Sequence, residues 1–148
     1  MFPEGIYVNL KRIKNYYGDF PICITEIGCS FDDAVSPDGR VHDSKRIVYL
    51  EEHISQIARA MNEGVNVRGI YVWSLLDNFE WTSGYTKRFG LVYVDFESHS
   101  GRIKDSGYWH GNFIKIKSIN IISGISPKLT LPVNLGDIPL IMSTLIFK

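Results

Sequence analysis

The residues best suited to chemistry lie between Tyr71 and Gly90, where an apolar run ends in a cluster of acids, an amide and aromatic side chains. In that cluster Glu80 stands between Phe79 and Trp81, so a strong hydrogen-bond acceptor lies between two apolar walls. This combination suits a sugar ring, which has an apolar face and a rim of hydroxyl groups. The same pattern is typical of a polar strand end with core aromatics, and the segment alone leaves both interpretations open.

Glu26 is a second candidate, because it ends the short apolar segment Ile22 to Glu26. A carboxylate at the carboxyl end of a buried parallel strand is well placed to act on a ligand. The alternative is a structural acid paired with a nearby arginine or lysine. The residues by themselves favour that alternative.

Alternating helical and strand patterns would position these residues. In chain order they predict a helix over residues 3–17, a strand over 22–26 and a long loop to residue 43. A helix capped by Asp43 or Ser44 then runs to about residue 63 and is followed by a strand over 69–75. The last elements are a strand-like segment over 89–96, a turn at 99–101 and a helix from 105 or 106 to 117. This order is typical of a parallel α/β architecture with its chemistry at the carboxyl ends of the strands.

The composition favours one soluble globular domain, since 45% of the 148 residues are apolar and 22% are charged. Sixteen acids balance sixteen bases, which gives no electrostatic case for binding nucleic acid or an anionic membrane. The first ten residues lack the pattern of a secretory signal, so we expect a cytoplasmic protein. Cys23 and Cys29 are expected to be free, buried thiols.

The composition changes at Ser118, where apolar residues begin to alternate with Ser, Thr, Pro and Gly. Three prolines interrupt the segment, and no run reaches the roughly 20 apolar residues that span a bilayer. Because neither a helical nor a strand period holds, residues 118–148 are predicted to be an atypical tail outside the domain.

Two motifs, Thr25-Glu26-x-Gly28 and Trp73-Ser-Leu-Leu-Asp-Asn-Phe-Glu-Trp81, resemble those of glycoside hydrolase family 1, which comprises retaining β-glycosidases, chiefly β-glucosidases. Further matching motifs are Pro3-Glu4-Gly5, Asp38-Gly39-Arg40-Val41-His42-Asp43, Gly84-Tyr85, Lys87-Arg88-Phe89-Gly90-Leu91, Tyr93-Val94-Asp95 and Lys104-Asp105-Ser106. They occur in order and at the right separations, so the resemblance covers nearly everything from Pro3 to about Lys117.

The resemblance implies a (β/α)8 TIM barrel, of which residues 1–117 would be the C-terminal part. Residues 22–26 would be its seventh strand and 69–75 its eighth, so the barrel is incomplete. Glu26 matches the family's catalytic nucleophile, which attacks the anomeric carbon and forms a glycosyl-enzyme intermediate. A second carboxylic acid, about 5–5.5 Å away, protonates the leaving oxygen and later activates water.

The resemblance also assigns the glycone subsite, with no cofactor or metal. Trp73 matches the aromatic floor under the non-reducing sugar, and Glu80 and Trp81 match the groups that hold its outer hydroxyls. Phe89 matches a further lining position, with core packing as its alternative. A carboxylate such as Glu80 would repel a phosphate, so the implied substrate is a neutral β-glucoside or small β-linked oligosaccharide.

Polar residues of the same excursion are interpreted as structural, since such groups more often fix a long loop than touch a ligand. They are Asp77, Asn78, Arg88 and Asp95.

Two departures from the family pattern limit the expected activity. Ile27 stands where the family usually has Asn, next to the nucleophile. The acid/base lies on the fourth strand in the family, and no stretch here replaces it. We therefore expect the isolated chain to be inactive, with the missing N-terminal part of the barrel as a candidate partner. A truncated non-catalytic remnant or an interaction module is the alternative, and the open strand edges and exposed apolar faces suit association.

Overall fold

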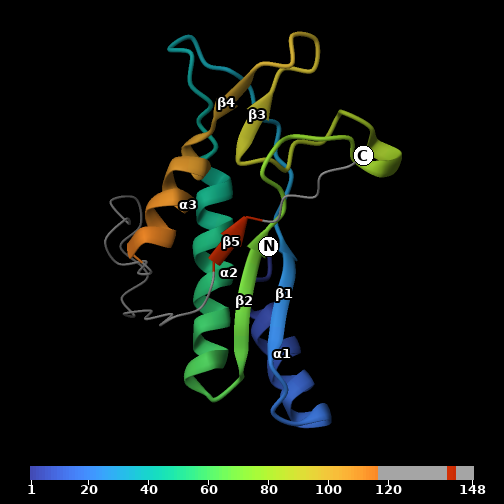
Figure 1. Cartoon of the computed structure of the whole chain (residues 1–148), viewed down its shortest axis with the longest axis vertical. Coiled ribbons are helices and arrows are strands. Elements are labelled where there is room, and N and C mark those ends of the chain that lie inside the picture. Colours follow the sequence, from blue (N-terminus) through green and yellow to red (C-terminus); the bar gives the residue numbers. More distant parts are fainter. Residues whose placement is uncertain (117–139, 143–148) are drawn as a thin grey trace.

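The computed structural model describes residues 1–116 and 140–142, and its elements follow the predicted alternation (Figure 1). In chain order they are α1 (Glu4–Tyr17), β1 (Ile22–Ile27), α2 (Ser44–Asn62), β2 (Val67–Val72), the short 3-10 helix η1 (Trp81–Ser83), β3 (Val92–Val94), β4 (Gly101–Ile103), α3 (Asp105–Ile116) and β5 (Leu140–Met142). Strands β1, β2 and β5 form a parallel sheet in that order, and β3 pairs with β4 in an antiparallel hairpin.

The second predicted strand is displaced toward the N-terminus, since β2 covers Val67–Val72 rather than residues 69–75. The backbone beyond Trp73 leaves the sheet because the returning part of the loop holds it. The Ser74 N–H donates to the carbonyl of Phe89 at 3.2 Å, and the Leu91 N–H donates to the carbonyl of Ser74 at 2.9 Å. The strand prediction was therefore wrong at both ends but right in its centre.

Strands β4 and β5 were not predicted. Strand β4 begins at the predicted turn and pairs with β3, which covers only Val92–Val94 of the strand-like segment 89–96. Strand β5 lies in the tail, where no strand was expected, and pairs with β2. The remainder of residues 118–148 lies outside the described residues.

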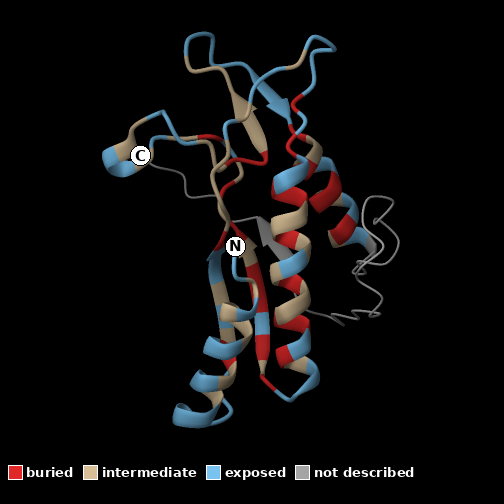
Figure 2. Ribbon diagram, turned by 180° about the vertical axis from the view of Figure 1, so that it is seen from behind, coloured by how far each residue is buried: buried red, intermediate tan, exposed pale blue. Residues whose placement is uncertain are grey.

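Helix α2 forms the centre of the core, because its buried apolar residues lie in a stripe along one of its faces. Leu50, Ile54 and Ile57 on this helix are fully buried, as are Ile70 of β2 and Phe113 of α3. Figure 2 shows buried residues along α2 and along β2, whereas β1 is mostly exposed or half-buried. Burial of one helix stripe against a parallel sheet is the layer arrangement of α/β proteins.

The opposite side of the sheet is open, which corrects the expectation that the first strand is buried on both faces. Cys23, Thr25 and Glu26 of β1 are exposed, and within the described residues β1 pairs only with β2. Helix α1 buries Leu10 but leaves Ile13 38% exposed. The cysteines are free as expected, but Cys23 is not buried.

None of the helices in residues 1–116 is long and apolar enough to cross a membrane.

Candidate active site

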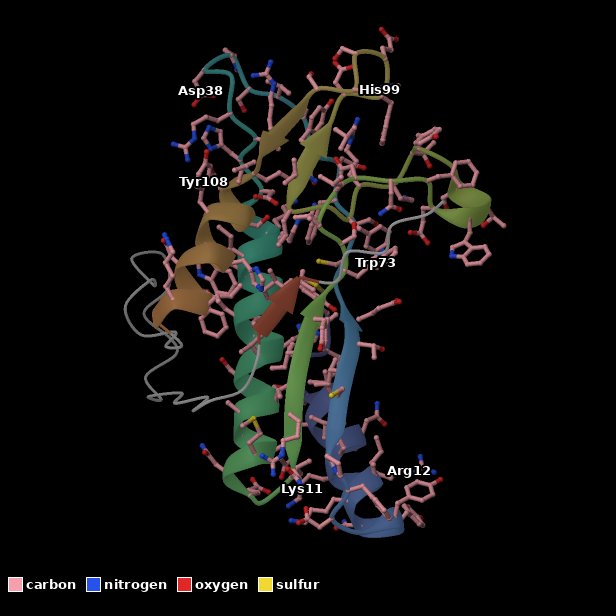
Figure 3. The ribbon with its side chains drawn as sticks, in the orientation of Figure 1. Lys11, Arg12, Asp38, Trp73, His99 and Tyr108 are labelled. Carbon is pink, nitrogen blue, oxygen red and sulfur yellow. The ribbon has the colours of Figure 1, made fainter. Side chains whose placement is uncertain are left out.

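The carboxyl ends of β1 and β2 bring Glu26 and Trp73 to the same edge of the sheet. Glu26 is the penultimate residue of β1, Trp73 directly follows β2, and the Trp73 N–H donates to the carbonyl of Ile27 at 3.0 Å. Figure 3 shows Trp73 just beyond the ends of the two strands. The Glu26 carboxylate is exposed there, open to a ligand.

Gly28 makes this close approach possible. A Cβ atom at position 28 would lie 1.9 Å from the carbonyl oxygen of Trp73, so no residue with a side chain fits. The glycine of the Thr-Glu-x-Gly motif therefore has a packing role beside Glu26.

The short helix η1, which begins at Trp81 directly after Glu80, lies at the tip of the loop that follows β2, away from the sheet (Figure 1). The tip is closed by backbone hydrogen bonds from Glu80 N–H to Gly84 O (2.8 Å) and from Ser83 N–H to Glu80 O (2.7 Å). Trp81 has a φ of 35° and is 82% exposed. The structure thus places Glu26 and Trp73 at the same edge of the sheet, presents Trp81 to solvent and leaves Glu80 half-buried.

Phe89 lies at the base of the same loop, on its return toward the sheet. Its side chain is half-buried, and its carbonyl accepts hydrogen bonds from Ser74 N–H and, at 3.4 Å, from Arg46 Nη1. These contacts fix its backbone, while its assignment to the sugar-binding surface stays a prediction.

Five charged side chains beneath these loops form a buried group that we call the anchor network: Asp33, Asp43, Arg46, Asp77 and Lys104. Lys104 is fully buried and joins two loops, because its Nζ lies 2.9 Å from Asp77 Oδ1 and also contacts Asp33 Oδ2. A buried ammonium group must be paired to offset its loss of hydration. Both acids provide that pairing here.

Arg46 links the network to the loop backbones. Its guanidinium contacts Asp33 and, at 2.8 Å, Asp43 Oδ2. The same group donates to the carbonyls of Cys29 and Phe89 and, at 3.2 Å, Arg88. One buried side chain from α2 therefore holds the loop after β1 and the loop after β2 in fixed positions.

Asp43 connects the N-terminal ends of α2 and α3. It precedes α2 as predicted, but its side chain does not cap that helix. Asp43 Oδ1 instead accepts from the backbone N–H of Ser106 at 2.8 Å, in the first turn of α3. A carboxylate at a helix N-terminus satisfies a free N–H and interacts favourably with the helix dipole.

The structural interpretation of the loop's polar residues is confirmed by their contacts. Asp77 accepts from Arg88 Nη1 at 2.6 Å and from Gly90 N–H at 2.8 Å, and the Arg88 guanidinium lies 3.9 Å from the centre of the Tyr93 ring. Asn78 donates to Ser74 Oγ at 3.1 Å.

Asp95 closes the turn between β3 and β4. Its Oδ1 accepts from the Glu97 and Ser98 N–H groups at 3.0 and 2.9 Å, and these bonds lower the pKa of Asp95. The bonds explain its structural role.

Sequence reasoning did not single out Asp33, Arg46 or Lys104 as a group. The available signals were a lysine inside a family motif and an arginine next to Ile47 in the apolar stripe of α2. Neither signal shows that the three side chains meet, because they are far apart in the chain.

Ile27 belongs to the hydrophobic core, where it is 4% exposed and lies beside Val72, its partner on the neighbouring strand β2. An apolar residue is well accommodated at this position.

Cys29 is a poor alternative nucleophile, because burial raises its pKa to about 12 and keeps the thiol protonated. Within residues 1–116 and 140–142, no group of three His, Cys, Asp or Glu side chains is arranged to hold a metal ion.

Two hollows flank the loops. One of about 420 Å³ is lined by residues that include Phe31, Asp33 and Lys87, and another of about 510 Å³ is lined by residues that include Phe79, Tyr85 and Phe96. Neither is lined by any of the five predicted site residues.

Comparison with known proteins places the chain in a family. The sequence pattern of "Glycosyl hydrolase family 1" matches residues 1–119. The chain belongs to glycosyl hydrolase family 1. The predicted resemblance to the C-terminal portion of a family 1 β-glucosidase is thereby confirmed.

Relatives in the family differ in the sugars that their names indicate. Beta-glucosidase A of Thermotoga maritima is 57% identical over 113 residues, covering 76% of this chain and 25% of the relative. A bifunctional beta-D-glucosidase/beta-D-fucosidase of Bifidobacterium breve is 47% identical, covering 76% and 25%. A 6-phospho-beta-galactosidase of Streptococcus equi subsp. zooepidemicus is 43% identical, covering 82% and 26%. The chain thus spans about a quarter of each relative.

The fold agrees with these relatives. The family 1 β-glucosidase of Thermotoga maritima, solved in complex with isofagomine lactam, superimposes with a TM-score of 0.75 at 57% identity, covering 76% of this chain and 26% of that one. The same enzyme in complex with castanospermine gives the same values. Family 1 β-glucosidases are TIM barrels, and the described residues form part of one, without a complete barrel.

Proposed function

We propose that this chain is the C-terminal part of a retaining β-glycosidase that hydrolyses terminal, non-reducing β-D-glucosyl residues in carbohydrate metabolism. The observation that carries the proposal is the exposed Glu26 carboxylate at the end of β1, beside Trp73 at the end of β2. The 57% identity to Thermotoga maritima beta-glucosidase A supports it.

In the proposed reaction a Glu26 oxygen attacks the anomeric carbon while the bond to the leaving oxygen breaks. An acid from another part of the barrel donates a proton to that oxygen, and the same group later removes a proton from the water that hydrolyses the glycosyl–Glu26 ester. The missing part of the barrel is thus the proposed partner, because it supplies the acid/base. The isolated chain is proposed to be inactive for the same reason.

The proposed glycone subsite consists of Trp73 below the sugar, with Glu80, Trp81 and Phe89 around it. The exposed position of Trp81 and the half-buried position of Glu80 suit residues that become covered by substrate and by neighbouring barrel loops. The neutral sugar is preferred because a phosphate would meet the negative charge of Glu80. Identity points the same way, being 57% to the β-glucosidase and 43% to the 6-phospho-β-galactosidase.

The test is a chimera in which residues 1–117 replace the matched quarter of Thermotoga maritima beta-glucosidase A. The chimera should hydrolyse an aryl β-glucoside, and Glu26→Ala should lower its turnover at least about 10⁴-fold, because the nucleophile is lost. Added azide should restore release of the aryl group by attacking the anomeric carbon in the vacated space. Because this attack comes from the side that Glu26 occupied, the product should be the α-glucosyl azide.

Glu52→Ala is the matched control, because Glu52 is an exposed acid on α2, outside the proposed site. It should leave turnover unchanged. If Glu26→Ala retained the turnover of the control, or if azide gave the β-anomer, Glu26 would not be the nucleophile. A folded chimera without activity would favour the non-catalytic alternative.

A further inference from the structure

The edge of β2 that faces away from β1 is occupied by β5. The two strands run parallel, with Ile70 opposite Leu140, Tyr71 opposite Ile141 and Val72 opposite Met142. Figure 1 shows β5 beside the upper half of β2. The tail of this chain therefore contributes a strand to the sheet that the family motifs build.

The strand order has the topology of a barrel wall. Strands β1, β2 and β5 lie in the sheet in the order in which they occur in the chain, so each new strand of this sheet is added on the same side. Helix α2 connects the first pair, α3 lies between β2 and β5 in the chain, and the two helices are in contact. A singly wound barrel grows in this way until its last strand pairs with its first.

If β1 and β2 are the seventh and eighth strands, as the proposed function holds, barrel closure assigns the far edge of β2 to the first strand. We propose that β5 is a surrogate for that strand. In this chain it covers the β2 edge, and it must leave when the first strand of a complementing chain pairs there.

Strand chemistry explains the need for such cover. An exposed edge presents free N–H and C=O groups and is a template for unwanted pairing with other chains. Strand β5 has three residues and pairs with three of the six in β2. A longer parallel strand can make more backbone hydrogen bonds to β2, so it can displace β5. The partner that fits this surface is an extended parallel strand from a chain that supplies the rest of the barrel.

The test removes a backbone N–H that β5 needs to pair with β2, in the full chain. Leu140→Pro and Ile141→Pro are made separately, because neighbouring residues direct their N–H groups to opposite sides and one of the two N–H groups must face β2. Leu140→Val and Ile141→Val are matched controls that retain the N–H and the β-propensity. Hydrogen exchange is followed over residues 67–72 and over α2.

At least one proline variant should increase the exchange rate over residues 67–72 by about tenfold, while α2 keeps its protection and the valine controls match the parent chain. Equal exchange over residues 67–72 in the parent and both proline variants would overturn the proposal.

A second measurement uses the portion of Thermotoga maritima beta-glucosidase A that precedes the matched quarter, as a separate chain. The proline variant should bind it with a Kd about tenfold lower than the parent, because β5 no longer competes for the edge. Equal or weaker binding would overturn the competition. Tighter binding without hydrolysis of an aryl β-glucoside would still support the competition for the β2 edge, and it would count against the proposed function instead.

Discussion

The base and the tip of the loops after β1 and β2 differ in what this chain supplies. At the base, every member of the anchor network finds its partners within the chain, and the Asp77 and Lys104 side chains are 0% exposed. At the tip, Trp81 is 82% exposed, and among residues 1–116 and 140–142 Glu80 has hydrogen bonds through its backbone only. The support of a binding surface is thus complete here, while the surface itself is open.

The physical reasons for the two states differ. A buried charge without a partner costs several kcal/mol, so the anchor network has to be satisfied wherever the loops fold. Groups that bind a sugar must instead stay available until the ligand arrives. If the comparison is valid, substitutions at the base should lower stability, whereas substitutions at the tip should affect only ligand chemistry.

The largest effect is expected from Lys104→Met, which keeps the side-chain volume but removes the charge. Asp77 and Asp33 would remain buried without their ammonium partner, so we expect a loss of about 3–5 kcal/mol in folding free energy. The measurement is hydrogen-exchange protection of α2, which should fall by the corresponding factor.

Arg40→Ala is the control for that substitution, because it removes a surface ion pair with Asp105, and the Arg40 side chain is 59% exposed. It should cost about 1 kcal/mol or less. If the two variants had equal protection, the anchor network would contribute no more than a surface pair, and the comparison between base and tip would fail.

The next effect concerns His110 of α3, which is 1% exposed and whose two ring nitrogens have no hydrogen-bond partner among the described residues. Burial lowers its pKa from 6.5 to about 4. Because the folded-state pKa is depressed, the stability contribution is fully present above about pH 6.5 and is lost as the pH falls toward 4. Protonation in the unfolded state should cost about 2 kcal/mol between pH 7 and pH 5.

Hydrogen-exchange protection of α2 at pH 7 and pH 5, corrected for intrinsic exchange, measures this loss. His110→Gln should remove most of the difference, because glutamine does not titrate. The exposed His42 acts in the opposite direction, since hydrogen bonds to Asp105 and Asp38 raise its pKa, and its contribution is lost as the pH rises. A pH difference retained in His110→Gln would rule out His110 as its source.

The same comparison explains what the sequence could predict. Local periodicity and ordered motifs predicted the helices, the centres of β1 and β2 and the edge that joins Glu26 to Trp73, because those features depend on neighbouring residues. The contacts between Arg46, Asp33 and Lys104 depend on residues 13 to 71 positions apart, and a single sequence does not reveal them. Strand β5 was missed because its pairing is set by the β2 edge rather than by a period of its own.

The smallest effect on stability is expected from Trp81→Ala at the loop tip. The side chain is 82% exposed, so its removal should change folding free energy by no more than about 0.5 kcal/mol. Trp109→Ala is the contrasting variant, because Trp109 is 4% exposed in the core and its loss should cost about 3–5 kcal/mol.

In the chimera, Trp81→Ala should lower kcat/KM for the aryl β-glucoside about 10- to 100-fold through lost sugar contacts. A large loss of α2 protection in Trp81→Ala would show that the tip supports the fold, whereas unchanged kinetics would show that it does not face the sugar.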